Sequence, residues 1–354
     1  MYMCYYRNLL LFFLILFSTI TAAQEVKKTT VFRSYASAVA QYNLYEQKHR
    51  KRKQTAHVKL AYLEWGKPGD KAFIWLHGSL SNAYEFMPFA ERIAQAGYHV
   101  IAIDQYNAGK TPLPPFDASF DDLCVDIKDL MENLGIKKAV IGGFSRGAFL
   151  ATNFYKQYPN SVSGLILEDG GSVAFKTSYE KLSKTALAAK LKSVNLPDEI
   201  KNKYFAEFSS KFQAYKSLFE PETKTNQFEI LSYIKPLKNK WITYKGLPEY
   251  YYMQDSLHMA KALFQTSTIS KYAASIINVD PVKIFQNLST PVLIMDANST
   301  TDPTPVLAEN KTLAASHPKY IQLKAFENVD HNIHFAYPDE FVKTITEFLK
   351  KFNI

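Results

Sequence analysis

Cysteine is nearly absent from this chain of 354 residues, which contains two, Cys4 and Cys124. Cys4 precedes an apolar N-terminal run and Cys124 falls in an amphipathic helix pattern. We therefore expect no intramolecular disulfide and a stability that depends on the hydrophobic core. We expect Cys124 to be a small buried apolar residue rather than a nucleophile. The chain also lacks the H-E-x-x-H pattern, a C-x-x-C pair and clustered acidic loops, so no metal site is predicted.

Acidic residues are scarcer than basic ones. The chain has 33 Asp and Glu and 42 Lys and Arg, which give a net charge of +9. The basic residues are dispersed, apart from one dense cluster at Lys48–Lys53. A cluster this short is typical of a solvated helix end or a linker. No aromatic-plus-basic module or helix-turn-helix pattern accompanies it, so no nucleic-acid partner is predicted.

The longest N-terminal apolar run, Leu9–Phe17, is too short for a comfortable membrane span. It follows Arg7 and precedes the small residues Ala22 and Ala23, which is the layout of a secretory signal peptide. We expect residues 1–23 to be this signal and the mature protein to be periplasmic or extracellular. An uncleaved membrane anchor is the alternative.

Short apolar runs alternate with helical patterns over residues 58–171 and again over 288–354. This alternation predicts an α/β fold whose mostly parallel central sheet has helices on both faces. Between the two stretches, residues 172–287 lack regular strand patterns and are rich in aromatic residues, so we expect a helical insertion there. Residues 24–57 are expected to form an N-terminal extension. An insertion that follows a sheet strand covers the carboxyl ends of the strands, where ligands bind in such folds.

The strongest chemical pattern is G-x-S-x-G at Gly143–Gly147, between a predicted strand and a predicted helix. A serine on a sharp strand-to-helix turn has strained backbone geometry. Side chains two residues before and after it would collide, which explains the two glycines. The helix that starts there directs its N-terminal amides at the serine. This context predicts that Ser145 is a nucleophile.

With this turn, the chain resembles the α/β-hydrolase superfamily over residues 58–170 and 288–352, and the insertion is placed like the cap of that family. Leu76–Ser79 resembles the family's His-Gly loop, in which the histidine is usually structural. The resemblance implies an oxyanion hole formed by the backbone amides of Ser79 and Arg146.

A serine hydroxyl needs a base, and His331 is the candidate. It follows the last predicted strand and precedes the last helix, where the family places its catalytic histidine. His334, in the same turn, matches a frequent second polar position, and we expect it to pack within the loop.

The base needs a carboxylate that orients it, and the family places this acid after the strand at Pro291–Met295. Both Asp296 and Asp302 qualify by chain order. Asp302 precedes a proline, as the acid of the family often does, and a carboxylate at the strand end points more nearly along the sheet. We therefore favour Asp302 over Asp296. Asp169, after an earlier strand, is a further alternative, although an ordinary strand-end aspartate is the default interpretation.

These residues predict an exported serine hydrolase that cleaves a carboxylic ester through an acyl-enzyme on Ser145. Asp302 and His331 complete the triad. The resemblance implies that no cofactor is needed, and the aromatic insertion favours a small-molecule ester with an apolar acyl or alcohol group. The sequence does not predict an oligomeric state.

Two other functions are compatible with the sequence. One is an aminopeptidase similar to proline iminopeptidases, which would use the same triad and need carboxylates of the insertion to hold a free amino group. The candidates for that role are Glu220, Glu222, Glu229 and Glu249. The other is a non-catalytic binding protein on a hydrolase scaffold, which the presence of serine, acid and histidine disfavours.

Overall fold

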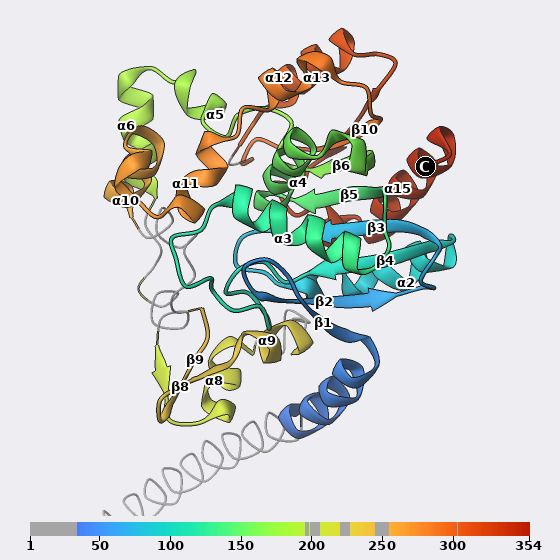
Figure 1. The fold of residues 1–354 in the computed structure, drawn as a ribbon. Coiled ribbons are helices and arrows are strands. Elements are labelled where there is room, and N and C mark those ends of the chain that lie inside the picture. Colours follow the sequence, from blue (N-terminus) through green and yellow to red (C-terminus); the bar gives the residue numbers. More distant parts are fainter. Residues whose placement is uncertain (1–33, 195–197, 199–205, 220–226, 245–254, 303) are drawn as a thin grey trace, which may run out of the picture.

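The computed structural model describes residues 34–354 except 195–197, 199–205, 220–226, 245–254 and 303. In this part of the chain an eight-stranded sheet forms the centre of the molecule (Figure 1), with the strand order β1-β2-β4-β3-β5-β6-β10-β11. Its strands are β1 (Arg50–Gln54), β2 (Lys59–Trp65), β3 (Lys71–Leu76), β4 (Tyr98–Ile103), β5 (Ala139–Phe144), β6 (Val162–Glu168), β10 (Val292–Asn298) and β11 (Ile321–Glu327).

The pairing agrees with the α/β fold predicted from the sequence. β1 pairs antiparallel with β2, and β2 pairs antiparallel with β4, whereas the pairs from β4 to β11 are all parallel. Every residue of β4 and β5 is buried. Such continuous burial is expected of parallel strands whose two faces are both covered by helices.

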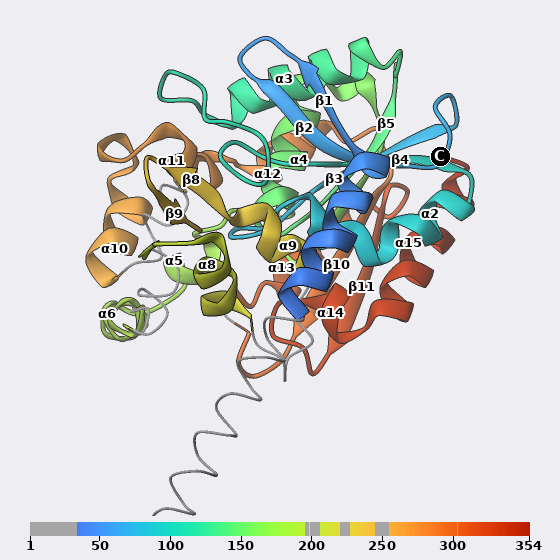
Figure 2. The ribbon, with the colours of Figure 1, turned by 90° about the horizontal axis from the view of Figure 1, so that it is seen from below.

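Helices cover both faces of the sheet (Figure 2). One core cluster contains α3 and α4 residues, and the other contains α2 and α15 residues. The side chains of Ser119 and Asp122 form a capping box at the start of α3. In α15 the buried residues recur at helical spacing, which directs one face toward the sheet. The helices are α2 (Met87–Gln95), α3 (Phe120–Asn133), α4 (Arg146–Gln157) and α15 (Pro338–Phe352). Cys124 is buried in α3, as predicted.

The basic cluster Lys48–Lys53 lies at a helix end only at its first two residues, and the rest forms a strand rather than the helix end or linker that we expected. Residues 34–49 are helical, and the chain then enters β1, which is the edge strand of the sheet. Four of the five β1 residues are exposed, whereas Arg50 is half-buried and bonds Asp104 at 2.7 Å. Charged side chains on an edge strand disfavour pairing with another chain.

The segment between β6 and β10 forms two groups of elements, which Figure 1 shows on one side of the sheet. The first group comprises α5 (Thr177–Glu180), α6 (Lys184–Ser193), α10 (Ser256–Phe264) and α11 (Lys271–Asn278). The second comprises α8 (Lys211–Leu218), α9 (Gln227–Tyr233) and a small sheet of β7 (Glu207–Phe208), β8 (Lys235–Leu237) and β9 (Lys240–Ile242). The sequence did not predict this small sheet, because its strands are only two or three residues long.

The N-terminal helix, residues 34–49, packs against the second group. Gln227 at the start of α9 donates to the Ser34 hydroxyl at 3.0 Å, and the rings of Tyr42 and Phe228 lie 5.9 Å apart. The predicted signal peptide, residues 1–23, lies outside the described residues. Among the helices of the described chain, none combines the length and apolar character that a membrane crossing requires.

Candidate active site

Ser145 occupies a sharp turn between β5 and α4. Its φ of 50° and ψ of −116° are strained for a residue with a side chain, and its N–H donates to the Glu168 carbonyl at 2.8 Å. A Cβ at Gly143 would lie 2.4 Å from the Gly147 backbone, and one at Gly147 would lie 1.9 Å from the Leu76 carbonyl oxygen. Both glycines are therefore needed for the chain to pass so closely on either side of the serine.

The predicted nucleophile and base lie together in the structure. The Ser145 hydroxyl and His331 Nε2 are 2.9 Å apart, which is a hydrogen-bond distance. His331 comes from the loop between β11 and α14 (Ile333–Ala336), and the side chain is 27% exposed. The other ring nitrogen, Nδ1, bonds a carboxylate oxygen of Asp169. A carboxylate on Nδ1 holds the ring with Nε2 facing the serine.

The structure corrects the expectation that Asp302 orients His331, because the carboxylate on Nδ1 belongs to Asp169. Asp169 follows β6 and has a left-handed φ of 43°, and its side chain is 1% exposed. Its second oxygen accepts the Ala297 N–H at 3.1 Å, and its own N–H donates to the Met295 carbonyl at 2.8 Å. The neighbouring strand β10 therefore holds Asp169 in place.

A signal for Asp169 was present in the sequence as two glycines, Gly170 and Gly171. A Cβ at Gly170 would lie 2.6 Å from the Ser145 carbonyl oxygen, and one at Gly171 would lie 2.3 Å from the Ala148 carbonyl oxygen. The pair lets the chain after Asp169 pass against the serine turn.

Asp302 bonds within its own loop. Its carboxylate accepts the Thr304 N–H at 2.8 Å. Partial burial raises the pKa of Asp302 to about 6, and the charge of Asp169 adds to this rise, whereas the charge of His331 opposes it. Asp302 is thus an electrostatic neighbour of His331, whereas Asp169 is its hydrogen-bond partner.

Asp296, the alternative acid, points away from His331. Its carboxylate accepts a hydrogen bond from the Asn310 amide of α13 (Leu307–Ser316). Burial raises the pKa of Asp296 to about 7. Successive side chains of a strand face opposite sides, and Asp296 shares the side of Ile294, which lies in one core cluster with Leu313 of α13.

Ser79 and Arg146, the predicted oxyanion donors, flank the serine. Arg146 is the first residue of α4, and the first amides of a helix have no acceptor within the helix. Ser79 lines the same cavity as Ser145. His77 is buried and anchors the loop before Ser79: it bonds the Gly78 carbonyl at 2.7 Å through Nδ1 and accepts the Gln105 N–H at 3.1 Å through Nε2. Burial lowers the pKa of His77 to about 4, so the ring is neutral.

A cavity of about 310 Å³ opens beside Ser145. Its polar lining comes mainly from Ser145, His331, Asp169 and a few hydroxyl or amide side chains. Its apolar lining comes from the start of the insertion, from α10 and α11, and from the loop after β10. These apolar residues are Val173, Ala174, Phe175, Tyr179, Met259, Ile276 and Val306, with Phe144 and Phe149 beside the serine. The site can therefore accommodate a compact apolar group next to a nucleophile.

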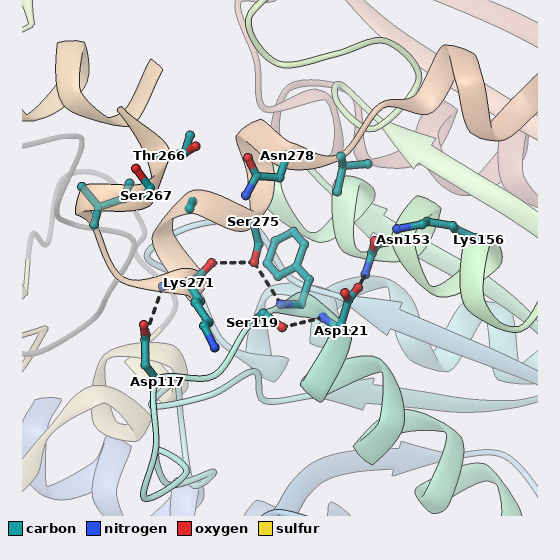
Figure 3. A pocket seen from close by; sticks show the side chains of 14 residues that line it. Asp117, Ser119, Asp121, Asn153, Lys156, Thr266, Ser267, Lys271, Ser275 and Asn278 are labelled. Atoms are coloured by element: carbon teal, nitrogen blue, oxygen red, sulfur yellow. Dashed lines mark hydrogen bonds between the residues drawn. The ribbon is translucent and has the colours of Figure 1, made fainter. Parts of the chain in front are cut away.

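A larger hollow of about 630 Å³ lies elsewhere, between α3, α4 and α11 (Figure 3). Its polar groups bond one another: Asp117 accepts the Lys271 N–H at 3.0 Å, Ser275 accepts the Phe120 N–H at 3.0 Å, and Asn153 donates to Asp121 at 2.8 Å. The first two bonds join α11 to α3 and the segment before it, and the third joins α4 to α3. The hollow does not contain Ser145 or His331, so its size does not make it the reaction site.

The chain is similar to known proteins over much of its length. The model of the alpha/beta hydrolase fold matches residues 71–338. Epoxide hydrolase 1 of Caenorhabditis elegans is 32% identical over 115 residues, which are 31% of this chain and 27% of the relative. The sn-1-specific diacylglycerol lipase ABHD11 of Mus musculus is 29% identical over 130 residues, which are 36% of this chain and 41% of the relative. The matches thus span less than half of either relative.

Solved structures agree in fold at low sequence identity. E-2-(acetamidomethylene)succinate hydrolase has a TM-score of 0.59 at 18% identity, with 85% of this chain and 98% of that chain covered. A structure from work on carboxylesterases of Nitrososphaera gargenis has a TM-score of 0.57 at 15% identity, with 86% and 98% covered. The family model covers most of the sheet and the whole insertion, and the fold agrees with it, so the chain belongs to the α/β-hydrolase family.

Proposed function

We propose that this chain is an exported serine hydrolase that cleaves a carboxylic ester through an acyl-enzyme on Ser145. The observation that carries the proposal is the hydrogen-bonded series Ser145–His331–Asp169 at the wall of an apolar cavity. A serine with a histidine in reach, itself oriented by a third group, is the arrangement that activates a hydroxyl. The cavity volume of about 310 Å³ is near the lower end of the range for small-molecule sites, which favours a short apolar acyl or alcohol group.

The reaction would proceed in two halves. In the first, His331 Nε2 takes the Ser145 proton as the oxygen attacks the ester carbonyl, and the amides of Ser79 and Arg146 stabilise the negative oxygen. The alcohol then leaves with the proton from His331. In the second half, His331 activates a water that attacks the acyl group, and the acid leaves as Ser145 regains its proton. Asp169 orients His331 throughout and stabilises the imidazolium.

The basicity of His331 fits this role. Burial lowers the pKa of His331. The hydrogen bond to Asp169 and the charges of Asp169, Glu168 and Asp302 together raise it by more than burial lowers it, so the net shift is upward from 6.5. A base with a raised pKa takes the serine proton more readily. The same shift means that activity falls as the pH drops through that raised pKa.

Ester substrates are favoured over epoxides, although the curated relatives that match include three epoxide hydrolases. Epoxide hydrolases of this fold have an aspartate at the nucleophile position, whereas this chain has Ser145. An attack by serine on an acyl carbon gives an intermediate that water can hydrolyse.

The aminopeptidase alternative has less support among the described residues. Glu229 does not line the cavity, and its carboxylate accepts the Ser81 hydroxyl at 2.8 Å. Glu220, Glu222 and Glu249 lie outside the described residues. Export is proposed from the N-terminal sequence alone, and the mass of the mature protein from its native host would test cleavage after Ala23.

A panel of p-nitrophenyl esters and aminoacyl anilides tests the function, with Ser145→Ala as the matched control. We expect short-chain esters to be turned over fastest and Ser145→Ala to lose at least about 10³-fold in kcat. Turnover that survives the substitution would contradict the mechanism. Anilides turned over faster than esters would favour the aminopeptidase, and specific binding without turnover would favour a non-catalytic protein.

A further inference from the structure

Three glutamates and one histidine lie behind the Ser145 site without belonging to the Ser145–His331–Asp169 series. Glu85, Glu168 and His334 are at most 3% exposed. Glu229, on α9 of the insertion, interacts electrostatically with Glu85 and His334. Burying carboxylates costs free energy unless hydrogen bonds or opposite charges compensate. Their hydrogen bonds show what these groups hold.

Glu85, in the short helix η1 (Ala83–Phe86), holds the loop that leads to Ser79. One carboxylate oxygen accepts the Gly78 N–H at 3.0 Å, and the other accepts the Trp75 indole N–H at 3.1 Å. The Gly78 carbonyl is bonded by His77 at 2.7 Å. Both backbone polar groups of Gly78 therefore have a fixed, buried partner.

These two bonds determine where the Ser79 amide points. The Gly78 carbonyl and the Ser79 N–H belong to one planar trans peptide, so they point in opposite directions. His77 fixes that plane through the carbonyl, and Glu85 fixes the plane before it through the Gly78 N–H. A Cβ at Gly78 would lie 2.6 Å from the Phe144 ring, so the loop packs directly against the strand that leads to Ser145.

Glu229 ties the next part of this loop to the insertion. Its carboxylate accepts a hydrogen bond from the Ser81 hydroxyl at 2.8 Å. Its backbone carbonyl accepts one from the side-chain NH₂ of Asn82 at 3.2 Å. Asn82 in turn caps η1, because its side-chain oxygen accepts the Tyr84 N–H. Glu229 thus links α9 to the segment between Ser79 and Glu85.

Glu168 and His334 complete the group on the side of the base. Glu168 accepts the backbone N–H and Nδ1 of His334 at 2.8 Å each, while its carbonyl accepts the Ser145 N–H. Burial lowers the pKa of His334. The charges of Glu168, Glu85 and Glu229 together raise it by more than burial lowers it, so the net shift is upward. These three charges favour the protonated form of His334 beside the glutamates.

We propose that Glu85 and Glu229 are positioning residues that hold the Ser79 amide toward the reacting oxygen, and that Glu229 makes this hold depend on helix α9 of the insertion. The inference rests on the proposed function, because Ser79 matters only if negative charge develops on an oxygen beside Ser145. It goes further by connecting the insertion to the oxyanion hole through Ser81.

Glu85→Gln tests the first part. A glutamine can accept one of the two hydrogen bonds, and its NH₂ group then opposes the other donor. Loss of one oxyanion donor costs about 10²–10³ in kcat, and we expect a displaced donor to cost about tenfold or more. KM for p-nitrophenyl butyrate and the pH midpoint of kcat/KM should change little, because neither depends on the Ser79 amide.

Trp75→Phe is the matched control, since it removes the other donor to Glu85 but leaves the Gly78 bond. We expect its kcat to stay within about threefold of wild type. Wild-type kcat in Glu85→Gln would overturn the inference, as would an equal loss in both variants, which would indicate a general packing defect.

Ser81→Ala and Glu229→Leu test the link to the insertion and remain informative if Glu85→Gln does not fold. Each substitution should lower kcat about threefold to tenfold. The double variant should lose no more than either single variant, because both substitutions remove the same hydrogen bond between Ser81 and Glu229. Glu229→Gln retains an acceptor for Ser81 and should retain kcat. Unchanged kcat in Ser81→Ala and Glu229→Leu would overturn this link.

A fluorophosphonate probe separates this inference from the proposed function. Ser145 attacks phosphorus, fluoride leaves, and His331 takes the proton, so labelling needs the oxyanion donors but no ester substrate. Labelling of wild type without ester turnover would count against the proposed substrate class alone. Equal labelling rates in wild type, Glu85→Gln and Ser81→Ala would overturn the positioning role.

Discussion

Strands β6 and β10 are parallel neighbours whose last residues lie at the same edge of the sheet, yet their two aspartates have different partners. Met295 of β10 pairs with Glu168 of β6, so the next residues are Asp296, within β10, and Asp169, directly after β6. Asp169 bonds His331 and accepts the Ala297 N–H. Asp296 bonds the Asn310 amide on the face covered by α13.

The difference arises from the backbone at the end of each strand. Asp169 leaves β6 through a left-handed turn, whereas Asp296 remains within β10 and follows its alternation. The Asp169 carboxylate has a partner on each oxygen. For Asp296, burial dominates and raises the pKa to about 7. Asp169 can thus orient His331 because the turn directs its carboxylate out of the sheet and hydrogen-bond donors compensate its burial.

Asp169→Asn should have the largest effect on catalysis. The amide cannot stabilise an imidazolium and favours the wrong tautomer of His331, so kcat should fall on the order of 10⁴-fold, as in a serine protease triad. Steady-state kinetics with a p-nitrophenyl ester measures the loss, and a circular dichroism spectrum checks the fold. A loss of this size in Asp302→Asn, with Asp169→Asn near wild type, would restore Asp302 as the acid.

Asp302→Asn should have a smaller effect, visible in the pH profile. The wild-type midpoint of kcat/KM should lie above 6.5, because the pKa of His331 is raised and His331 must be neutral to accept the serine proton. Asp302 contributes to that rise through its charge, so its loss should move the midpoint down slightly. We expect kcat at high pH to stay within about tenfold of wild type. An upward shift of the midpoint would contradict the electrostatic role.

Asp296→Asn should leave catalysis near wild type and change the pH dependence of stability. Burial raises the pKa of Asp296 from its ordinary value of 3.8 to about 7 in the folded chain. Between these pH values the folded state holds a proton that the unfolded state has released. The Asp296 contribution to the free energy of unfolding is therefore full below pH 3.8 and lost as pH rises to about 7.

Urea unfolding of wild type and Asp296→Asn across this pH range measures that contribution. The difference in unfolding free energy, variant minus wild type, should increase with pH and level off above about 7. A constant difference would show that folding does not raise the pKa of Asp296. Loss of ester turnover in this variant, with the fold intact, would instead give Asp296 the role proposed for Asp169.

Features carried by adjacent residues were predictable from the sequence. Gly143 is required by a contact with Gly147 within one strand-turn-helix unit, so the local pattern contains the reason for it, whereas Gly147 is required by the close approach of Leu76 at the end of β3. The resemblance to the α/β-hydrolase family implied the role of His331, because the family places its catalytic histidine between the last strand and the last helix. The alternation of strands and helices predicted the parallel sheet, because burial on both faces leaves continuous apolar runs.

Features that depend on segments far apart in the chain were not predictable in this way. The basic residues of Lys48–Lys53 gave no strand pattern, because an edge strand with exposed side chains shows little apolar alternation. The strands β7–β9 are too short to leave a pattern. Glu229 had no local signal for its contact with Ser81, since the two residues are 148 positions apart.

The sequence alone determined the α/β fold and a serine on a strained turn within it, because glycine spacing and apolar periodicity are local properties. The role of the histidine near the C-terminus was implied by the resemblance to the α/β-hydrolase family. The tertiary structure decided which aspartate meets that histidine. Asp302 and Asp296 have the expected chain order, but only the adjacency of β6 and β10 brings the Ala297 N–H to Asp169 and leaves Asp296 facing α13. Order along the chain does not specify the direction of a side chain at the end of a strand, which depends on the turn and on the neighbouring strand.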